Sequence, residues 1–488
     1  MKNGHIKNLI SLYKSWSGNK AESINPLPPS GSQRKYYRIQ NNDKPVIGAY
    51  NPDKKENQAF IYLSKHFLKN KLNVPKIFST DLNKNIYLLE DLGDQTVYSF
   101  IEATRSGKNI TKPIVSIYKE IIEELPKFQV LGSNGLDYSK CYPRPAFDKQ
   151  SIMWDLNYFK YSYLKPSNIP FDEQKLEDNF NFFAEYLLQA DSNYFMYRDF
   201  NTRNIMMKNN ELYFIDYQGG RRGPLQYDIA SLLFSSRADI PFEIREQLLE
   251  HYIKSVSRIE RINSLSFKKY YYEFVLIRIL QMLGAYGYRG YFEGKAHFLQ
   301  SIPYALKNLE YLNSKNKIKI KSKIKELMTV IERFITSENN NLVLRKTDNS
   351  KLTVTINSFS YRNKIPTDYS GHGGGFVFDC RAIPNPGRLE QYKSLTGMDK
   401  PVQDFLNSQR EAKIFLKDTF DLVDQSVQSY IERNWTNLIV NYGCTGGQHR
   451  SVYCAEKLAK HVKQKFDVNV LLVHTEQRNK LVTKKQSY

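Results

Sequence analysis

Three oxygen-bearing side chains lie close together in the stretch YRDFNTRNIMMKNNELYFIDYQGG, and their types suit phosphoryl transfer. Asp199 and Asn204 are separated by a short loop, and Asp216 follows an apolar run that is typical of a strand. Phosphoryl transfer from ATP needs a carboxylate that receives the proton of the acceptor hydroxyl. It also needs oxygen ligands that hold Mg²⁺ on the nucleotide phosphates. We therefore predict Asp199 as the catalytic base, Asn204 and Asp216 as metal ligands, and ATP and Mg²⁺ as cofactors.

The order of these residues is close to the protein-kinase pattern H-R-D-x-x-x-x-N followed by D-F-G. Here it reads YRD at 197–199, then Asn204, then DYQ at 216–218. Asp228 opens a predicted helix and is placed to brace the catalytic loop. The alternative is a surface loop and β-hairpin with acidic residues there by chance. The joint occurrence of motif, strand and spacing favours the kinase-like interpretation.

The chain before this stretch predicts a small β-rich lobe. Alternating and apolar runs indicate strands, and helical spacing of Phe60, Leu63 and Phe67 indicates a helix. The expected strands are 35–39, 46–49, 74–78 and 86–89, and the expected helix is 56–67.

Several residues of this lobe are candidates for nucleotide binding. A glycine in a short hairpin lets backbone N–H groups approach phosphates, and residues 30–32 (SGS) precede the first strand pair. Glu90 begins the run EDLGD, a predicted hinge between two lobes where adenine commonly sits. An ordinary turn and an ordinary strand-to-helix loop are the alternatives. The predicted nucleotide contacts are Ser30, Gly31, Ser32, Arg34, Arg38 and Glu90.

The chain from 97 to about 335 is predicted to be mostly helical. The aromatic stripe at 154–159 is a possible substrate wall, with core packing as the commoner role of such stripes. The apolar segment 274–288 is broken by Arg278 and predicts a buried helix rather than a membrane span. Alternating lysines at 315–325 predict a solvated linker and helix start, with RNA contact as the alternative.

A second domain is predicted after the polar, Asn-rich segment 337–351, which we interpret as a linker. Strands alternate with helices beyond it, which argues for an α/β sheet. The expected strands are 352–358, 376–380, 438–442 and 468–473, and glycines 371 and 373–375 precede the second of them.

A glycine-rich turn in this domain joins a strand to a helix. Such a turn directs backbone N–H groups and the positive helix end at an anion, beyond the carboxyl ends of the strands. It lacks the Gly-Lys-Ser/Thr ending of a Walker loop, so we expect a phosphorylated metabolite or RNA phosphate rather than NTP hydrolysis. The predicted ligand residues are Thr445, Gly446, Gly447, His449, Arg450 and Ser451, joined by Arg381 and His474 from other strand ends.

Two alternatives for this turn stay open. Its glycines are also expected if the backbone simply needs a tight turn. Cys444 and Arg450 have the spacing of a Cys-x₅-Arg phosphatase loop, in which the cysteine would be the nucleophile.

Length and composition limit the classes of protein to which this chain can belong. A chain of 488 residues with 41% hydrophobic residues is expected to form two or three globular domains. The four cysteines show no CxxC spacing, and no secretory signal is evident, so we expect a soluble cytoplasmic protein without membrane contact. The formal charge of +21 is compatible with anionic partners, RNA included, but it is spread along the chain.

Residues 1 to about 335 resemble the aminoglycoside phosphotransferase and choline kinase superfamily. The resemblance is strongest to the anomeric N-acetylmuramate/N-acetylglucosamine kinases of cell-wall recycling. It rests on the segments SGSQRKYYRI, EDLGDQTV, YRDFNTRNIMM, FIDYQGGRRGPLQYDIASLL and IPYALKNL. It implies a bilobal kinase fold and ATP·Mg²⁺ chemistry on a small hydroxylated substrate, with Asp199 as base and Asn204 and Asp216 as metal ligands.

Two positions depart from the kinase pattern. Tyr197 replaces the usual histidine, and the strand 46–49 has no lysine where kinases pair one with the phosphates. Arg34, Lys35 or Arg38 could supply that charge.

Residues 352–488 resemble the C-terminal domain of the RNase adapter protein RapZ. The resemblance rests on FDCRAIPNPGR, LTGMDKPVQDFL and GCTGGQHRSVYCAEKLA. It implies binding of a hexosamine phosphate at the glycine-rich turn and, in some members, of small regulatory RNA. The N-terminal P-loop domain of that family is absent here, and the kinase-like domain stands in its place.

These observations predict an α+β bilobal protein-kinase-like domain followed by a smaller α/β domain. The expected division is an N-lobe at 1–92, a helical C-lobe at 93–336, a linker at 337–351 and the RapZ-like domain at 352–488. The predicted function is ATP-dependent phosphorylation of a small hydroxylated substrate, an amino sugar of cell-wall metabolism. The second domain would bind a sugar phosphate or RNA. The alternative is a non-catalytic nucleotide- or sugar-sensing RNA-binding adapter.

Overall fold

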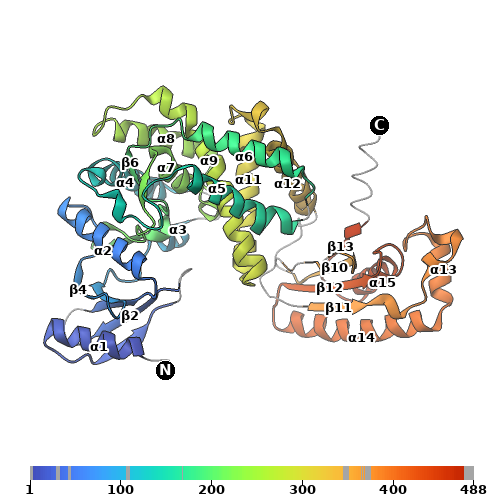
Figure 1. The fold of residues 1–488 in the computed structure, drawn as a ribbon. Helices are drawn as coiled ribbons and strands as arrows, with labels where there is room; N and C mark the ends of the chain where they lie inside the picture. The colour runs from blue at the N-terminus through green and yellow to red at the C-terminus, as the bar shows by residue number, and fades with distance from the viewer. Residues whose placement is uncertain are drawn as a thin grey trace. The chain divides into compact units, whose positions relative to one another are not determined.

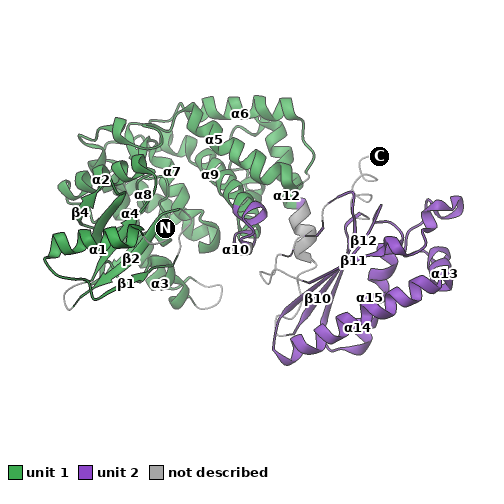
Figure 2. Ribbon diagram, turned by 60° about the horizontal axis from the view of Figure 1, so that its bottom comes forward, with its two compact units in different colours: residues 1–288, 301–335 green, residues 289–300, 336–488 purple. Residues whose placement is uncertain are grey.

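The computed structural model of the protein describes residues 4–28, 33–41, 45–105, 110–167, 169–343, 351–363, 365–366, 368 and 375–476. The chain divides into two compact units (Figure 1, Figure 2). The first unit comprises 1–288 and 301–335, and the second comprises 289–300 and 336–488.

The first unit begins with a five-stranded antiparallel sheet. Its strand order is β1-β2-β3-β5-β4. The strands are β1 (Ser23–Pro26), β2 (Lys35–Gln40), β3 (Val46–Tyr50), β4 (Ile77–Asp81) and β5 (Ile86–Glu90). β4 starts three residues later than expected from the sequence, because Pro75 cannot donate a hydrogen bond to a strand ladder.

Helix α1 (Gly4–Ser17) covers one face of this sheet. Its Leu9 and Tyr13 pack with the strand residues Tyr37, Ile39 and Val46 in one apolar cluster. Side chains alternate between the faces of a strand. Arg34, Tyr36 and Arg38 are therefore placed on the opposite face.

Helix α2 (Lys54–Lys69) links the sheet to the larger lobe. Its N-terminus is capped by Asp53, which accepts hydrogen bonds from the N–H groups of Lys55 and Glu56. Phe60 of α2 stacks on Tyr87 of β5 and on Tyr217, with both ring centroids at 5.3 Å. The DYQ motif thus packs directly against the helix of the small lobe.

The larger lobe is built mainly from helices around two short two-stranded antiparallel sheets. One sheet pairs β6 (Tyr194–Met196) with β9 (Arg221–Gly223), and the other is the hairpin of β7 (Ile205–Lys208) and β8 (Glu211–Phe214). Asn209 and Asn210, which join β7 to β8, both have the positive φ of a tight hairpin. The helices are α3 (Val97–Thr104), α4 (Lys112–Gln129), α5 (Lys149–Phe159), α6 (Glu173–Leu187), α7 (Leu225–Leu233), α8 (Phe242–Val256), α9 (Ser264–Gly287), α11 (Ile302–Ser314) and α12 (Lys325–Val343).

The buried helix expected at 274–288 is the second half of α9. It lies in contact with α5, α7 and α11. Gly284 brings its backbone close to the end of α5 at Tyr158, and Gly287 brings it close to the chain that follows α5, since a Cβ at Gly287 would lie 2.1 Å from the carbonyl oxygen of Ser162. In the described part of the chain, no helix is both long enough and apolar enough to cross a membrane.

The second unit holds a four-stranded parallel sheet with the order β11-β12-β10-β13. The strands are β10 (Thr353–Ser360), β11 (Gly375–Asp379), β12 (Asn437–Cys444) and β13 (Asn469–His474). The helices of this unit are α10 (Ala296–Leu299), α13 (Lys400–Ser408), α14 (Arg410–Glu432) and α15 (Arg450–Lys465). Helix α15 packs against β10, β12 and β13. The strands predicted in this domain are confirmed to within a few residues.

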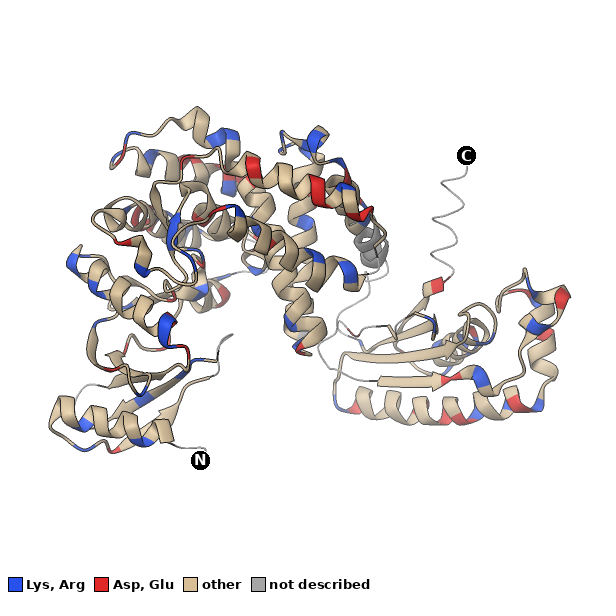
Figure 3. Ribbon diagram, viewed as in Figure 1, with Lys and Arg blue, Asp and Glu red and all other residues tan. Residues whose placement is uncertain are grey.

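Two sequence expectations concern the chain between the units and its charge. Helix α12 runs to Val343, into the segment predicted as a linker. Lys and Arg are dispersed among Asp and Glu over both units (Figure 3). The fold class expected from the sequence, a bilobal kinase-like domain followed by an α/β domain, is confirmed.

Candidate functional site

The loop that carries Asp199, the predicted catalytic base, follows β6 and is held by Asp228 of α7. The carboxylate of Asp228 accepts hydrogen bonds from the backbone N–H groups of Tyr197 (2.8 Å) and Arg198 (2.9 Å). Gln129 donates a third hydrogen bond at 3.1 Å. Burial raises the pKa of Asp228 to about 7, although the three donors oppose that shift. The brace predicted for Asp228 is confirmed.

Tyr197, which replaces the usual histidine, is buried beneath this loop. Its hydroxyl donates a 2.6 Å hydrogen bond to the carbonyl oxygen of Ile215, the residue before Asp216. It therefore connects the loop that carries Asp199 to the segment that carries Asp216. A tyrosine at this position thus supports the geometry of both segments.

Arg198 also serves the loop. Its φ of 81° lies in the left-handed region. Its guanidinium donates to the carboxylate of Asp155 on α5 (Nη1 to Oδ2, 2.7 Å) and to the hydroxyl of Tyr227 (2.6 Å). Strained backbone conformations persist only where their surroundings hold them, and they concentrate at functional sites.

The three residues predicted for catalysis and metal binding converge. The side-chain amide of Asn204 donates to the carbonyl oxygen of Asp199 (2.9 Å) and to Oδ2 of Asp216 (3.3 Å). The side chain of Asp199 is 50% exposed, so it is accessible to an acceptor hydroxyl. Burial raises the pKa of Asp216, and the nearby negative charge of Asp199 raises it further.

These residues fit a magnesium ion. Carboxylate and amide oxygens are ligands that Mg²⁺ prefers, and the ion commonly takes few protein ligands together with substrate phosphates. A divalent cation would also offset the repulsion between Asp199 and Asp216. In the described residues no group of three or more His, Cys, Asp or Glu is placed to hold a metal. A magnesium site made of Asp216, Asn204 and nucleotide phosphates needs no such group, because the phosphates supply the remaining ligands.

The predicted nucleotide-binding residues have different surroundings. Ser30, Gly31 and Ser32 lie outside the described residues. Glu90, at the end of β5, accepts a 2.7 Å hydrogen bond from Nζ of Lys208 on the β7–β8 hairpin. The predicted hinge is thereby connected to the larger lobe.

The two predicted arginines differ from each other. Arg38 donates to the carboxylates of Asp91 (Nε to Oδ2, 2.5 Å) and Asp94 (Nη2 to Oδ1, 2.9 Å), both in the predicted hinge. Arg34 is 4% exposed, and its Nη2 lies 3.0 Å from Oε1 of Glu56 on α2. Burial would lower the pKa of Arg34, but Tyr36, Tyr87 and Glu56 together raise it, so the guanidinium stays charged.

Sequence reasoning missed Glu56 and Arg278 as members of this region. Arg278 of α9 lies with Nη2 3.9 Å from Oδ1 of Asp199 and donates from Nε to the Ser231 hydroxyl at 3.0 Å. The signal for Arg278 was present, because an arginine inside an apolar helix needs polar partners. For Glu56 the signal was its position near the start of the first helix after β3.

Trp154, in the stripe proposed as a substrate wall, is 46% exposed. The guanidinium of Arg144 lies over its ring, 5.5 Å from the centroid. From the same stripe, Asp155 binds Arg198 and Phe159 is buried. Part of the stripe therefore supports the catalytic loop and the core.

In the second unit the glycine-rich turn lies between β12 and α15, at the carboxyl edge of the parallel sheet. Thr445 and Gly446 are exposed, and Gly447 has a φ of 64°. A Cβ at Gly447 would lie 2.3 Å from Cγ of Glu476, so the turn is tight here. Ser360 donates a 2.7 Å hydrogen bond to the carbonyl oxygen of Thr445.

The polar side chains at the start of α15 bind backbone groups of this chain. His449 Nε2 lies 2.9 Å from the carbonyl oxygen of Tyr392. Arg450 donates 3.0 Å hydrogen bonds from Nη1 to the carbonyl oxygens of Arg381 and Ile383. These bonds hold the loop after β11 beside the turn.

The other predicted ligand residues of this domain lie at the same sheet edge. Arg381 is paired with Asp379, with Nη2 to Oδ2 at 2.6 Å. His474 lies between the hydroxyl of Ser358 (2.8 Å) and Oε1 of Glu456 (3.1 Å). Ser451 is fully buried, and its hydroxyl is 3.2 Å from Sγ of Cys444. Cys444 is only 3% exposed, which does not suit a nucleophile.

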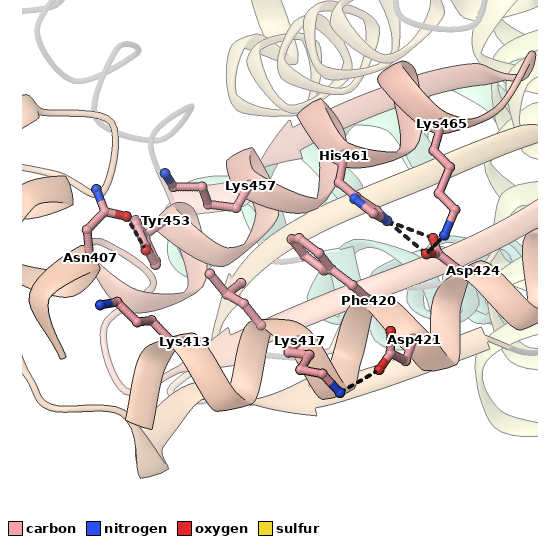
Figure 4. A pocket seen from close by; sticks show the side chains of 11 residues that line it. Asn407, Lys413, Lys417, Phe420, Asp421, Asp424, Tyr453, Lys457, His461 and Lys465 are labelled. Carbon is pink, nitrogen blue, oxygen red and sulfur yellow. Dashed lines mark hydrogen bonds and ion pairs between the residues drawn. The ribbon is translucent and has the colours of Figure 1, made fainter. Parts of the chain in front are cut away.

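A separate hollow lies between α14 and α15 (Figure 4). His461 stacks on Phe420 there, and both His461 and Lys465 contact Asp424. None of the residues predicted to bind a ligand lines this hollow.

Two family models match the chain. Residues 23–261 match the phosphotransferase enzyme family, and residues 352–478 match the RapZ C-terminal domain. Among curated proteins, a "Nucleotide-binding protein" of Janthinobacterium sp. is 41% identical over 133 residues, which cover 27% of this chain and 44% of the relative. Another, of Nitrosomonas europaea, is 46% identical over 112 residues, covering 23% and 37%. The chain thus spans about two fifths of the length of the curated relatives it matches.

Solved structures with some similarity include kinases of small molecules. The choline kinase LicA from Streptococcus pneumoniae is 15% identical with a TM-score of 0.43, covering 62% of this chain and all of that one. A thermostable mutant of aminoglycoside phosphotransferase APH(4)-Ia is 11% identical with a TM-score of 0.39, covering 61% and 98%. The assignment rests on the two family models and on the topology of each unit. The chain joins a phosphotransferase-family domain to a RapZ C-terminal domain.

Proposed function

We propose that the first unit is an ATP-dependent phosphotransferase that acts on a hydroxyl of a small substrate, an amino sugar of cell-wall metabolism. The observation that carries the proposal is the convergence of Asp199, Asn204 and Asp216 beside the small lobe. The match to the phosphotransferase enzyme family supports the reaction class. The amino sugar is proposed from the resemblance of the motifs alone.

In this proposal Asp199 receives the proton of the acceptor hydroxyl while the hydroxyl oxygen attacks the γ-phosphorus of ATP. A bond forms between that oxygen and phosphorus, the bond to the bridging oxygen breaks, and ADP leaves. Asn204 and Asp216 would hold Mg²⁺, which supplies positive charge for the transferring group. Nucleotide contacts are proposed for Ser30, Gly31, Ser32, Arg34, Arg38 and Glu90.

The second unit is proposed to bind a sugar phosphate at the turn after β12. The exposed backbone of Thr445 and Gly446, at the start of α15 and the carboxyl edge of the sheet, supports anion binding there. His449, Arg450 and Ser451 contribute through the fold of the turn.

The test of the kinase proposal is ADP release with Mg·ATP against a panel of amino sugars. General base catalysis is typically worth roughly 10²–10⁴-fold in rate. We therefore expect Asp199→Ala to lose turnover by about this factor while ATP binding, followed by calorimetry, is preserved. Asp178→Ala, which removes an exposed aspartate of α6, serves as the matched control. Full turnover in Asp199→Ala would remove this residue from the mechanism.

A second candidate function is a non-catalytic adapter that senses a nucleotide or sugar and binds RNA. Two observations favour it: β3 carries no lysine, and residues 352–478 match the RapZ C-terminal domain. The two candidates differ in one readout. An adapter binds nucleotide without any sugar-dependent release of ADP, whereas the kinase shows such release.

A further inference from the structure

Strand β3 presents no positive charge to the side of the sheet that faces away from α1. A Cβ at Gly48 would lie 2.9 Å from Ile39 and 3.1 Å from Leu9, so Gly48 faces α1. By alternation Ile47 and Ala49 face the other side, and both are uncharged. Protein kinases place a lysine on this strand, where it pairs with the nucleotide phosphates and with a glutamate of the neighbouring helix. In this chain another residue must supply the cation.

Arg34 reaches the same side of the sheet from the neighbouring strand. Tyr36 pairs with Ala49 in the β2–β3 ladder, and Arg34 lies two residues before Tyr36 on the same face. Its Nη1 donates to the Tyr36 hydroxyl at 3.3 Å. Arg34 is 4% exposed, with Nη2 3.0 Å from Oε1 of Glu56.

Glu56 is itself held in position by two contacts. Its backbone N–H donates to the capping carboxylate of Asp53 at 3.1 Å. Its Oε2 accepts a 2.7 Å hydrogen bond from the side-chain amide of Asn51. The carboxylate is therefore fixed at the start of α2, and it holds the Arg34 guanidinium in turn.

The Arg34 guanidinium lies over the ring of Phe60 on α2, 5.5 Å from its centroid. Phe60 in turn stacks on Tyr217, the residue after Asp216. One aromatic ring therefore connects Arg34 to the segment that carries the predicted metal ligand. The other two basic residues considered, both in β2, have different surroundings from Arg34. Lys35 is exposed, on the opposite face, and Arg38 is bound by Asp91 and Asp94 of the hinge.

We propose that Arg34 binds the phosphates of the nucleotide in place of the strand lysine, and that Glu56 is its positioning residue. This inference rests on the proposed kinase function. A guanidinium can donate two parallel hydrogen bonds to phosphate oxygens, whereas an ammonium acts as a point charge. Arg34, the residue before β2, would thus supply the positive charge for the phosphates, and Glu56 of α2 would hold its guanidinium in place.

The test measures the dissociation constant of Mg·ATP by calorimetry, with circular dichroism as the check of folding. Loss of a charge-assisted contact should weaken Mg·ATP binding by at least about tenfold in Arg34→Gln. Arg34→Lys keeps the charge and is expected to lie between wild type and Arg34→Gln. Glu56→Gln should weaken Mg·ATP binding less than Arg34→Gln. Lys54→Gln removes an exposed positive charge at the start of the same helix and should bind as wild type does.

A rescue variant separates phosphate binding from a merely structural role. Ala49→Lys places a lysine on β3, on the face that Arg34 occupies. In the Arg34→Gln background it should recover part of the lost affinity. Arg34→Gln that folds and binds Mg·ATP as wild type does would overturn the inference. So would a loss of affinity confined to Arg38→Gln.

The outcomes also separate this inference from the proposed function. Wild type that fails to bind Mg·ATP, or that binds it without any ADP release, contradicts the kinase proposal and removes the basis of the inference. Wild type that turns over, with Arg34→Gln unchanged in affinity and KM for ATP, contradicts only the role of Arg34. If Arg34→Gln does not fold, Arg34→Lys and Glu56→Gln decide: wild-type affinity in both overturns the inference.

Discussion

Individual side chains hold the backbone of the catalytic loop. Asp228 binds two consecutive N–H groups of that loop, Tyr197 connects it to Ile215, and Arg198 anchors it to Asp155. Asp199 itself is left half-exposed between these anchors. Anchoring by these three side chains explains how one carboxylate can stay accessible while its main chain is held.

The pKa of Asp228 leads to a pH-dependent prediction. Because burial raises it to about 7 in the folded protein, and an aspartate of the unfolded chain titrates near ~3.9, folding binds a proton between these values. The stability contributed by this group is present at low pH and is lost as pH rises through about 7. We expect Asp228→Asn to lower the free energy of unfolding, and to lower it more at pH 5 than at pH 8.

Urea denaturation at the two pH values measures this difference. Asp178→Asn, an exposed change of the same type on α6, is the control and should unfold as wild type does at both. Equal destabilisation of Asp228→Asn at pH 5 and pH 8 would contradict the raised pKa.

At the scale of the elements, α9 organises the larger lobe through its close approach to α5 and to the chain that follows α5. Gly284 lies against the backbone at Tyr158, and Gly287 against Ser162. This approach brings Arg278, on the same helix, to the side of Asp199. The packing of α9 against α5 and the chain after it therefore places the Arg278 guanidinium near the carboxylate predicted to be catalytic.

We expect Gly287→Ala to destabilise the protein, because its Cβ would lie 2.1 Å from the carbonyl oxygen of Ser162 and backbone must move. Overpacking of this kind typically costs about 1–3 kcal/mol. Thermal unfolding followed by circular dichroism measures the effect. Gly4→Ala in α1, where a Cβ meets nothing within 4 Å, is the matched control and should leave the midpoint nearly unchanged. A wild-type midpoint for Gly287→Ala would show that α9 and the facing chain can separate at little cost.

At the scale of the whole molecule, the chain carries a kinase-like unit and a RapZ-like unit with a formal charge of +21. The positive charge is not gathered in one stripe, since basic and acidic residues are interspersed over both units (Figure 3). Such a distribution favours contact with anions in general over recognition of one nucleic acid.

We expect any RNA binding by the full chain to fall steeply when the salt concentration is raised from about 50 to about 200 mM, because phosphate contacts release counterions. ADP release should change far less, since charges inside a partly buried site are screened less than exposed ones. Filter binding with a short RNA and the ADP assay, run across the same salt series, measure both. RNA binding that tolerates salt would indicate recognition by stacking or base contacts.

The sequence by itself determined the element types, the α/β character of the second unit and the motif that brings Asp199, Asn204 and Asp216 together. These depend on short-range features: alternation along a strand, helical spacing, and fixed intervals between Asp199, Asn204 and Asp216. Motif spacing was also sufficient to place Asp228 at the loop. Features of this kind depend on residues that lie close together in the sequence, so they can be recognised without the fold.

Only the tertiary structure decided which of the basic residues Arg34, Lys35 and Arg38 packs against α2, and which groups hold it. Arg34 directly precedes β2 and Arg38 belongs to it, and both are placed on the same face of the sheet, yet one binds Glu56 of α2 and the other binds the hinge. The same holds for Arg278, whose apolar helix gave no hint of Asp199 as a neighbour. Such contacts join elements far apart in the chain, and their packing, rather than any local pattern, selects the partners.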